Sequence, residues 1–167
     1  MHRASRRLST TQLSTVTLRP VRSGDEGFLL SVYASTREEE LAQVDWSEDQ
    51  KQAFVLQQFR AQDRHYREHY TGAEYLVIEV EGEPAGRLYV VRWDDEIRIM
   101  DIALLREFRN RGIGSHLLGG LIEESRRSGK PLTIHVERFN PALALYQRLG
   151  FKPVEDEGVY LLMRWSA

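Results

Sequence analysis

The chain has 167 residues, 41% hydrophobic and 29% charged, which is long enough for one domain with a sizeable core and too short for two. Its 23 basic and 25 acidic residues nearly balance, so the composition does not indicate a nucleic-acid partner. The absence of cysteine excludes disulfides, thiolate catalysis and cysteine-ligated metals, and no apolar run approaches the ~18–20 residues of a membrane span. These features favour a cytoplasmic protein with neither a membrane nor a nucleic-acid partner.

The first residues differ in composition from the rest. Residues 1–15 are rich in Arg, Ser and Thr, which predicts a disordered tail, although organelle transit peptides have a similar composition. Residues 16–167 are expected to form a single domain.

Short apolar runs and helix-period segments alternate along this domain. The elements expected in chain order are a strand at 16–21, a helix after the Gly24-Asp25 cap, an irregular segment at 34–47, a helix from Ser47 to about Tyr70, a hairpin of strands 75–81 and 85–92, a strand at 97–104, a helix from about Gly112 to Gly129, a strand at 132–137, a short helix opened by Asn140-Pro141, and strands at 151–154 and 159–165. Gly150 stands where a left-handed C-cap is expected.

This order, β-α-α-β-β-β-α-β-α-β-β, mixes hairpin connections with a helical crossover. It predicts an α/β or α+β fold with a central mixed, mostly antiparallel sheet of about seven strands and four helices.

The strongest chemical signal lies between the strand at 97–104 and the helix that follows it. The segment is Arg109-Asn110-Arg111-Gly112-Ile113-Gly114-Ser115. A helix N-terminus has backbone N–H groups without internal partners and a positive dipole end, and the arginines add charge, so this turn is suited to a phosphate. It is neither a P-loop, because Ser115-His116 follows Gly114, nor a dinucleotide fingerprint, because Leu117 replaces the third glycine.

The segment from Asp101 to Gly114, followed by an amphipathic helix, resembles the acetyl-CoA motif of the GNAT N-acetyltransferase superfamily. Downstream, Asn140-Pro-Ala142 through Tyr146 to Leu149-Gly-Phe151 is similar to that superfamily's second hallmark. Both occur in the expected order with a strand between them, and the likeness covers nearly all of residues 16–165. It implies a GNAT-like fold and an enzyme that moves an acetyl group from acetyl-CoA to a primary amine of a small molecule or peptide.

The resemblance also implies positions for the acetyl-CoA. The pyrophosphate would lie on the turn amides of Arg109, Asn110, Arg111, Gly112, Ile113, Gly114 and Ser115. The pantetheine arm would pair with the backbone of Ile102, Ala103 and Leu104, where two parallel strands separate after Leu104 and near Val136. Asn140 and Tyr146 would also contact the cofactor. Leu105-Arg106 lacks the proline usual in the family at its second position.

Tyr146 matches the family's tyrosine that donates a proton to the leaving thiolate, and Asn140 matches a residue that caps the short helix and touches the pantetheine or a water. The less favoured alternative is that Tyr146 is a core aromatic of that helix. The general base is open. Asp101 alternates with Ile97, Ile99 and Ala103, so it reads as a lone carboxylate among apolar neighbours and a candidate proton acceptor, directly or through water. It could instead be a structural carboxylate bonded to backbone or to an arginine. His135 and Glu137 are alternatives.

In this architecture the acceptor would be selected by the segment between the first two helices and by the hairpin. The pocket candidates are Tyr33, Glu38, Glu39, Glu40, Trp46 and Trp93, which would suit a cationic amine, although runs of Glu are usually solvated surface. The resemblance leaves the identity of the amine open and is consistent with a homodimer.

Two competing interpretations remain. His65-x-x-Glu68-His69 satisfies an inverted zinc-protease pattern, but its neighbours look like a solvated helix, so no metal is expected. Alternatively, a domain of the same fold could bind acyl-CoA without catalysis, as a sensor or interaction module.

Overall fold

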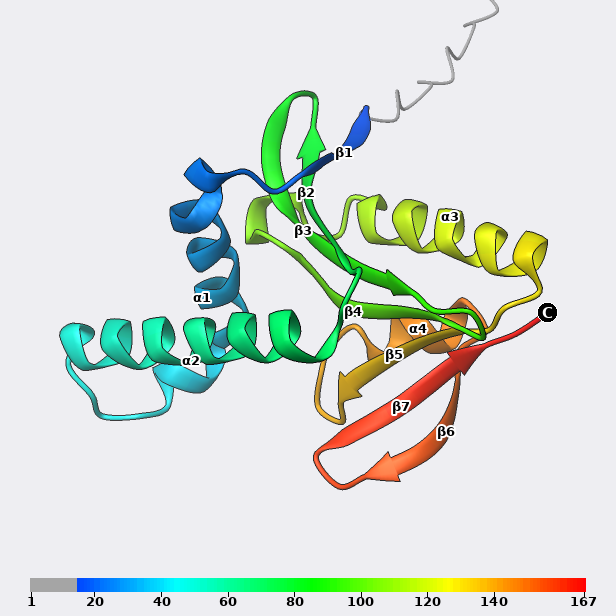
Figure 1. The fold of residues 1–167 in the computed structure, drawn as a ribbon. Helices are drawn as coiled ribbons and strands as arrows, with labels where there is room; N and C mark the ends of the chain where they lie inside the picture. Colours follow the sequence, from blue (N-terminus) through cyan, green and yellow to red (C-terminus); the bar gives the residue numbers. More distant parts are fainter. Residues whose placement is uncertain (1–14) are drawn as a thin grey trace, which may run out of the picture.

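The protein folds around one seven-stranded sheet flanked by helices, as the computed structural model of residues 15–167 shows (Figure 1). The elements are β1 (Val16–Pro20), a 3-10 turn (Ser23–Asp25), α1 (Glu26–Ala42), α2 (Glu48–His69), β2 (Glu74–Val80), β3 (Glu83–Arg92), β4 (Ile97–Leu104), a second 3-10 turn (Arg106–Phe108), α3 (Ile113–Ser128), β5 (Leu132–Glu137), α4 (Leu143–Arg148), β6 (Lys152–Glu157) and β7 (Tyr160–Trp165). The predicted order of strands and helices is confirmed, and none of the helices in residues 15–167 is long and apolar enough to cross a membrane.

The strands follow the spatial order β1-β2-β3-β4-β5-β7-β6, and every neighbouring pair is antiparallel except β4 with β5. The parallel pair arises because α3 carries the chain over the sheet between them, as a helical crossover requires. The sheet is therefore mixed and mostly antiparallel, as predicted.

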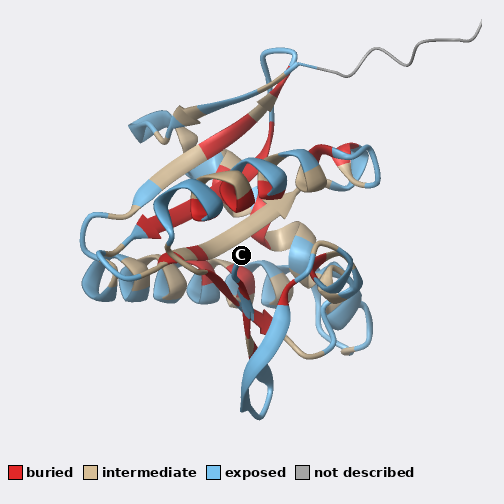
Figure 2. Cartoon of the chain, turned by 90° about the vertical axis from the view of Figure 1, so that its right-hand side faces the viewer, coloured by how far each residue is buried: buried red, intermediate tan, exposed pale blue. Residues whose placement is uncertain are grey.

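Two apolar clusters hold the helices on opposite faces of the sheet. The larger cluster lies between α3, α4 and the strands β2, β3, β4, β5 and β7. It includes Leu88, Ile99, Leu118 and Tyr146. The smaller one, Leu29, Tyr33, Val55 and Phe59, joins α1 to α2. Figure 1 shows α1 and α2 on one side of the sheet and α3 on the other. Buried residues concentrate in the central strands, whereas the outer β6 is exposed along its whole length (Figure 2).

The first helix is longer than the sequence predicts. Residues 34–47 were expected to be irregular, but α1 continues to Ala42. The reason is an apolar stripe, because Ala34 and Leu41 follow Leu30 at helical spacing and pack against the α1–α2 cluster. The following helix begins as predicted, with Ser47 and Gln50 forming a capping box.

The short helix α4 begins at Leu143 rather than at Pro141. Asn140 nevertheless caps the turn before it, because its Oδ1 accepts a hydrogen bond of 2.8 Å from the backbone N–H of Ala142. Gly150 follows α4 with φ of +102°, which confirms the predicted left-handed backbone after this helix.

Candidate active site

A gap in the sheet begins where β4 and β5 stop pairing. Their parallel ladder contains only three registered pairs, from Ile97 with Leu132 to Ile99 with Ile134. Beyond this point β4 continues along β3, and β5 continues along β7. The sequence predicted the separation after Leu104 and near Val136, so the strands part several residues earlier. The facing backbone edges of residues 100–104 and 135–137 are consequently available for pairing with another extended group.

The turn that leads from β4 into α3 lies at the end of this gap. Asn110 and Gly112 have positive φ values of 58° and 79°, which reverse the chain so that α3 starts at Ile113. The first amides of α3, those of Ile113, Gly114 and Ser115, have no acceptor within the helix. A Cβ at Gly114 would make an ordinary contact of 3.8 Å with the side chain of Leu145, so α4 lies beside this helix start without crowding it.

The two arginines of the turn do not play the same part. Arg109 is turned inward, where its Nε donates to the carbonyl of Leu104 (2.9 Å) and its Nη2 donates to Oγ of Ser35 on α1 (3.2 Å). The guanidinium of Arg111 lies 5.5 Å from the ring centroid of Phe108. The Arg109 side chain therefore anchors the turn to β4 and α1, and the anion-binding groups that remain at this turn are mainly backbone amides.

Tyr146 projects from α4 into the region beside the gap. Its side chain is 3% exposed and packs edge-on against Phe151, with ring centroids 5.8 Å apart. Burial, together with the charge of Asp101, raises the pKa of the phenol above its usual range. The hydroxyl has no hydrogen-bond partner in residues 15–167, yet none of the described polar side-chain atoms is both sealed and unpaired. The oxygen therefore reaches solvent-accessible space.

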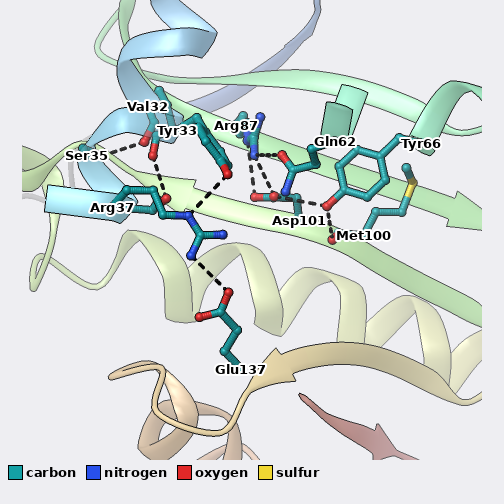
Figure 3. A network of polar contacts seen from close by, with 11 residues as sticks. Val32, Tyr33, Ser35, Arg37, Gln62, Tyr66, Arg87, Met100, Asp101 and Glu137 are labelled. Atoms are coloured by element: carbon teal, nitrogen blue, oxygen red, sulfur yellow. Dashed lines mark hydrogen bonds and ion pairs between the residues drawn. The ribbon is translucent and has the colours of Figure 1, made fainter. Parts of the chain in front are cut away.

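Asp101 is not a lone carboxylate among apolar residues. Its Oδ2 accepts a 2.7 Å hydrogen bond from Nη2 of Arg87 on β3 and a longer one, 3.4 Å, from the hydroxyl of Tyr66 on α2. Arg87 is 2% exposed and also donates to Oε1 of Gln62 at 2.7 Å (Figure 3). Of the two sequence interpretations, the structure therefore supports a carboxylate bonded to an arginine.

A β-bulge explains why the strand pattern misplaced Asp101. Tyr89 pairs with Asp101 but Val90 pairs with Ile99, so Met100 is an extra residue in β4. Ile99 faces the large cluster with α3, whereas Asp101 faces α2. A single inserted residue shifts the alternation, which a period-two reading of the sequence cannot detect.

The two alternative bases lie on β5 beyond the last pair with β4. His135 contacts Glu157 at 3.4 Å, and partial burial together with Arg98 lowers the pKa of its imidazole. Glu137 forms an ion pair of 3.2 Å with Arg37 of α1, so this contact crosses from the α1 side of the gap to β5 (Figure 3).

The predicted acceptor pocket is only partly assembled. Tyr33 lies beside the network, with its ring centroid 5.3 Å from the guanidinium of Arg37 and 5.8 Å from that of Arg87. Of the acidic run, Glu40 contacts Arg37 and Glu38 pairs with Arg106. The remaining candidates are elsewhere or uninvolved: Glu39 is exposed on α1, Trp46 packs on Phe54, and Trp93 stacks on Tyr70 at the far end of β3.

Sequence reasoning missed the residues that complete this network, namely Arg37, Gln62, Tyr66 and Arg87. For one of them, Arg87, the sequence contained evidence of a buried ion pair. Arg87 interrupts the apolar strand from Ala85 to Val91, and a charged residue there is buried only when it is paired.

The zinc-protease pattern does not form a metal site among the described residues. The rings of His65 and His69 stack 4.4 Å apart on α2, and Nδ1 of His69 contacts the carbonyl of His65 at 3.0 Å. Within residues 15–167 no group of three or more candidate ligands comes together.

A mostly antiparallel sheet that opens between its two parallel strands, beside a helix N-terminus, defines a class of acyltransferase folds. Residues 19–151 match the model of the Acetyltransferase (GNAT) family, which is most of the chain, and the protein therefore belongs to this family.

Comparisons with individual proteins agree with this assignment. A Bacillus subtilis (strain 168) protein, provisionally named ribosomal protein bS18-alanine N-acetyltransferase, is 30% identical over 102 residues, 56% of this chain and 68% of that protein. The PaiA N-acetyltransferase of Thermoplasma acidophilum, solved in complex with coenzyme A, superposes with a TM-score of 0.69 at 16% identity, covering 92% of this chain and 99% of that one. A GNAT acetyltransferase of Elizabethkingia anophelis with acetyl-CoA bound gives 0.57 at 19%, covering 91% and 98%. At these identities the two solved structures show a shared fold.

Proposed function

We propose that this protein transfers an acetyl group from acetyl-CoA to a primary amine. The observation that carries the proposal is the gap between β4 and β5, with the open amides of α3 at one end and the solvent-reaching hydroxyl of Tyr146 beside it. The family membership supports the same class of reaction.

The residues present fit acetyl-CoA. Ile102, Ala103 and Leu104 have no β5 partner, so an extended pantetheine arm can pair with the gap-facing backbone groups of this stretch, other than the Leu104 carbonyl that Arg109 already occupies. The pyrophosphate fits the amides of Gly112 to Ser115, where the dipole of the 16-residue α3 favours an anion. When bound, acetyl-CoA supplies an activated thioester carbonyl.

The transfer requires a neutral amine and a proton for the departing sulfur. The amine nitrogen forms a bond to the carbonyl carbon, and the carbon–sulfur bond breaks. Tyr146 supplies the proton, because burial keeps its phenol protonated throughout the neutral pH range. Asn140 supports this geometry by capping the turn before α4, which carries Tyr146.

The amine must also lose a proton, to water or to a carboxylate. Asp101 stays a candidate through Oδ1, which within residues 15–167 accepts a single hydrogen bond, of 3.3 Å from Nε of Arg87. Its other oxygen is already shared by Arg87 and Tyr66. We therefore assign proton removal to water, with Asp101 acting through that water.

Thermal unfolding with and without acetyl-CoA tests the binding half of the proposal. At about 100 times the dissociation constant, the ligand should stabilise the protein by ~2.7 kcal/mol, or roughly 5–10 °C. Gly114→Asp should abolish this shift, because it adds a carboxylate where the pyrophosphate binds, without destabilising the free protein, since an acidic residue suits a helix N-terminus.

The matched control is Gly120→Asp, the same change on the same helix at an exposed position with open space around it. It should keep the full acetyl-CoA shift. If the wild-type protein shows no shift, or if both variants lose it equally, the proposed acetyl-CoA site is wrong.

A further inference from the structure

The ion pair between Arg37 and Glu137 spans the gap on the side of the sheet that carries α1. Arg37 extends from α1 and Glu137 from the end of β5, and their contact is 3.2 Å between Nη1 and Oε1 (Figure 3). Both side chains are partly accessible, at 22% and 34%. Because acetyl-CoA would enter the gap along α3, an acceptor coming from the opposite face meets this pair.

Each partner of the pair retains an unused polar atom. Arg37 bonds through Nε to Tyr33 and through Nη1 to Glu40 and Glu137, so within residues 15–167 its Nη2 has no acceptor. Glu137 bonds through Oε1, and its Oε2 has no donor in the same part of the chain. One side of the gap therefore offers a cationic donor, and the other offers an anionic acceptor.

These two atoms match a ligand that carries both charges on neighbouring groups. A carboxylate can take the donor of Arg37, and an ammonium can lie on Oε2 of Glu137. The exchange leaves neither protein charge unpaired, whereas a simple cation would compete with Arg37 for Glu137 and leave the guanidinium with only the more exposed Glu40 as a counter-charge.

Resting on the proposed acetyl transfer, we propose that the acceptor is a free α-amino acid, held by its carboxylate on Arg37 and by its amino group near Glu137. Arg37 and Glu137 are then specificity-determining residues. In the reaction the ammonium loses one proton to solvent, the neutral nitrogen bonds to the acetyl carbon, and the nitrogen then loses a second proton to solvent. The carbon–sulfur bond breaks, and the thiolate takes the proton of Tyr146, which solvent replaces.

The test compares kcat/KM for the twenty amino acids with that for their amides and decarboxylated amines. For the amino acid that the enzyme uses best, we expect kcat/KM to exceed that of its amide by about 10- to 100-fold, because only the free acid forms a charged hydrogen bond with Arg37. Arg37→Gln should raise KM for the amino acid by the same factor, whereas KM for the decarboxylated amine should not rise, because that amine no longer competes with Arg37 for Glu137.

The matched control is Arg106→Gln, which removes the exposed 3.1 Å contact between Arg106 of the second 3-10 turn and Glu38 of α1. It should leave the acid-to-amide preference intact. The melting temperature and the acetyl-CoA shift of each variant are measured alongside, so a loss of folding is not mistaken for a loss of selectivity.

The proposal is overturned if amides or amines are used as well as the free acids, or if Arg37→Gln and Arg106→Gln have equal effects. It is also overturned if acetyl-CoA binds but none of the twenty amino acids is acetylated. If acetyl-CoA itself fails to bind or to react with any amine, the proposed function fails instead, and the two failures are thus distinguishable.

Discussion

Tyr146 and Asp101, both near the gap in the sheet, differ in how their polar atoms are satisfied. The hydroxyl of Tyr146 has no partner in the described chain and reaches solvent-accessible space. Asp101 is bound by Arg87 and Tyr66. A polar atom left open beside a gap is available to a ligand, whereas one that is already bonded mainly maintains structure. Tyr146 is thus suited to the proposed role of proton donor, whereas Asp101 is held by its protein partners.

The first prediction concerns Tyr146→Phe. It removes the proposed acid while keeping the ring that packs on Phe151. We expect kcat to fall by about 10²- to 10⁴-fold with an unchanged dissociation constant for acetyl-CoA. Steady-state kinetics and calorimetric titration measure the two quantities. Tyr75→Phe, on the distant strand β2, should leave both unaltered. Equal turnover by Tyr146→Phe would favour a non-catalytic acyl-CoA-binding domain or a different acid.

The pH dependence of kcat gives a second check on Tyr146. Burial raises the pKa of its phenol above the usual value of ~10, so the proton is retained as the pH rises through neutrality. We therefore expect no loss of kcat attributable to Tyr146 below about pH 10. A falling limb at lower pH that disappears in Tyr146→Phe would contradict this expectation.

At the scale of elements, the end of β4 is shaped by its contact with β3. Gly86 of β3 pairs with Leu104, and a Cβ at Gly86 would lie 2.1 Å from the carbonyl oxygen of Ala103. Real Cβ atoms do not approach backbone so closely, so only glycine allows the strands to meet here. The backbone that we expect to pair with pantetheine is therefore positioned from the β3 side.

Gly86→Ala should consequently disturb the acetyl-CoA site as well as the fold. Because the clash is with backbone, we expect a loss of roughly 1–3 kcal/mol in unfolding free energy and weaker acetyl-CoA binding. Urea unfolding and calorimetry measure these changes. Gly119→Ala, at an exposed position of α3 with nothing near its Cβ, should instead stabilise the protein by about 0.5–1 kcal/mol. Similar effects of the two changes would argue against the close contact.

The corner between β1 and α1 depends on one carboxylate. Asp25 accepts hydrogen bonds from both terminal nitrogens of Arg19 (2.8 and 2.9 Å) and from the backbone N–H of Arg22 (2.6 Å). These donors lower the pKa of Asp25 to about 2. This value lies below the ~3.9 of an aspartate in an unfolded chain, so between these two pKa values the folded state binds fewer protons than the unfolded state. The free energy of unfolding therefore decreases as the pH is lowered.

We therefore expect Asp25→Asn to be less stable than the wild type at neutral pH, with a difference that shrinks below about pH 4, is mostly lost at about pH 2 and disappears near pH 1. Urea unfolding at several pH values measures it. Asp95→Asn, in the turn between β3 and β4, is a control that removes the same charge. We expect it to change the free energy of unfolding only slightly and without the loss of that difference at low pH. A difference for Asp25→Asn that stayed constant down to pH 2 would contradict the assigned role.

At the scale of the whole molecule, one buried polar network joins the helices to the sheet. Gln62 and Tyr66 of α2 contact Arg87 of β3 and Asp101 of β4. The apolar cluster between α1 and α2 is small, so this network supplies specific contacts that dock α2 on the sheet. The network lies on the face of the sheet from which we expect the acceptor to approach.

Arg87→Met should lower the free energy of unfolding, because it removes the central donor of this network. It leaves Asp101 without its main partner, and breaking a buried pair from one side typically costs about 3–5 kcal/mol. Replacing both partners, as in Arg87→Met with Asp101→Leu, should recover part of that loss. Urea unfolding of the two variants provides the comparison. If the double variant were less stable than Arg87→Met alone, the ion pair would not account for the loss.

Local residue patterns were enough to predict the order of the elements and the turn before α3. These are local properties, since helix-period spacing, capping residues such as Ser47, and glycines at turns act within a few residues. The sequence also marked Tyr146 and Asn140, because their positions belong to a motif that is continuous in the chain.

The side chains that meet across the gap could not be predicted from local patterns, because long-range packing brings them together. The bulge at Met100 turns Asp101 away from the face that simple alternation predicts, and pairing between strands creates such a bulge. Arg87 and Arg37 find their carboxylates 14 and 100 residues away along the chain. Contacts at such separations depend on how the sheet, α1 and α2 pack, because no local spacing encodes them.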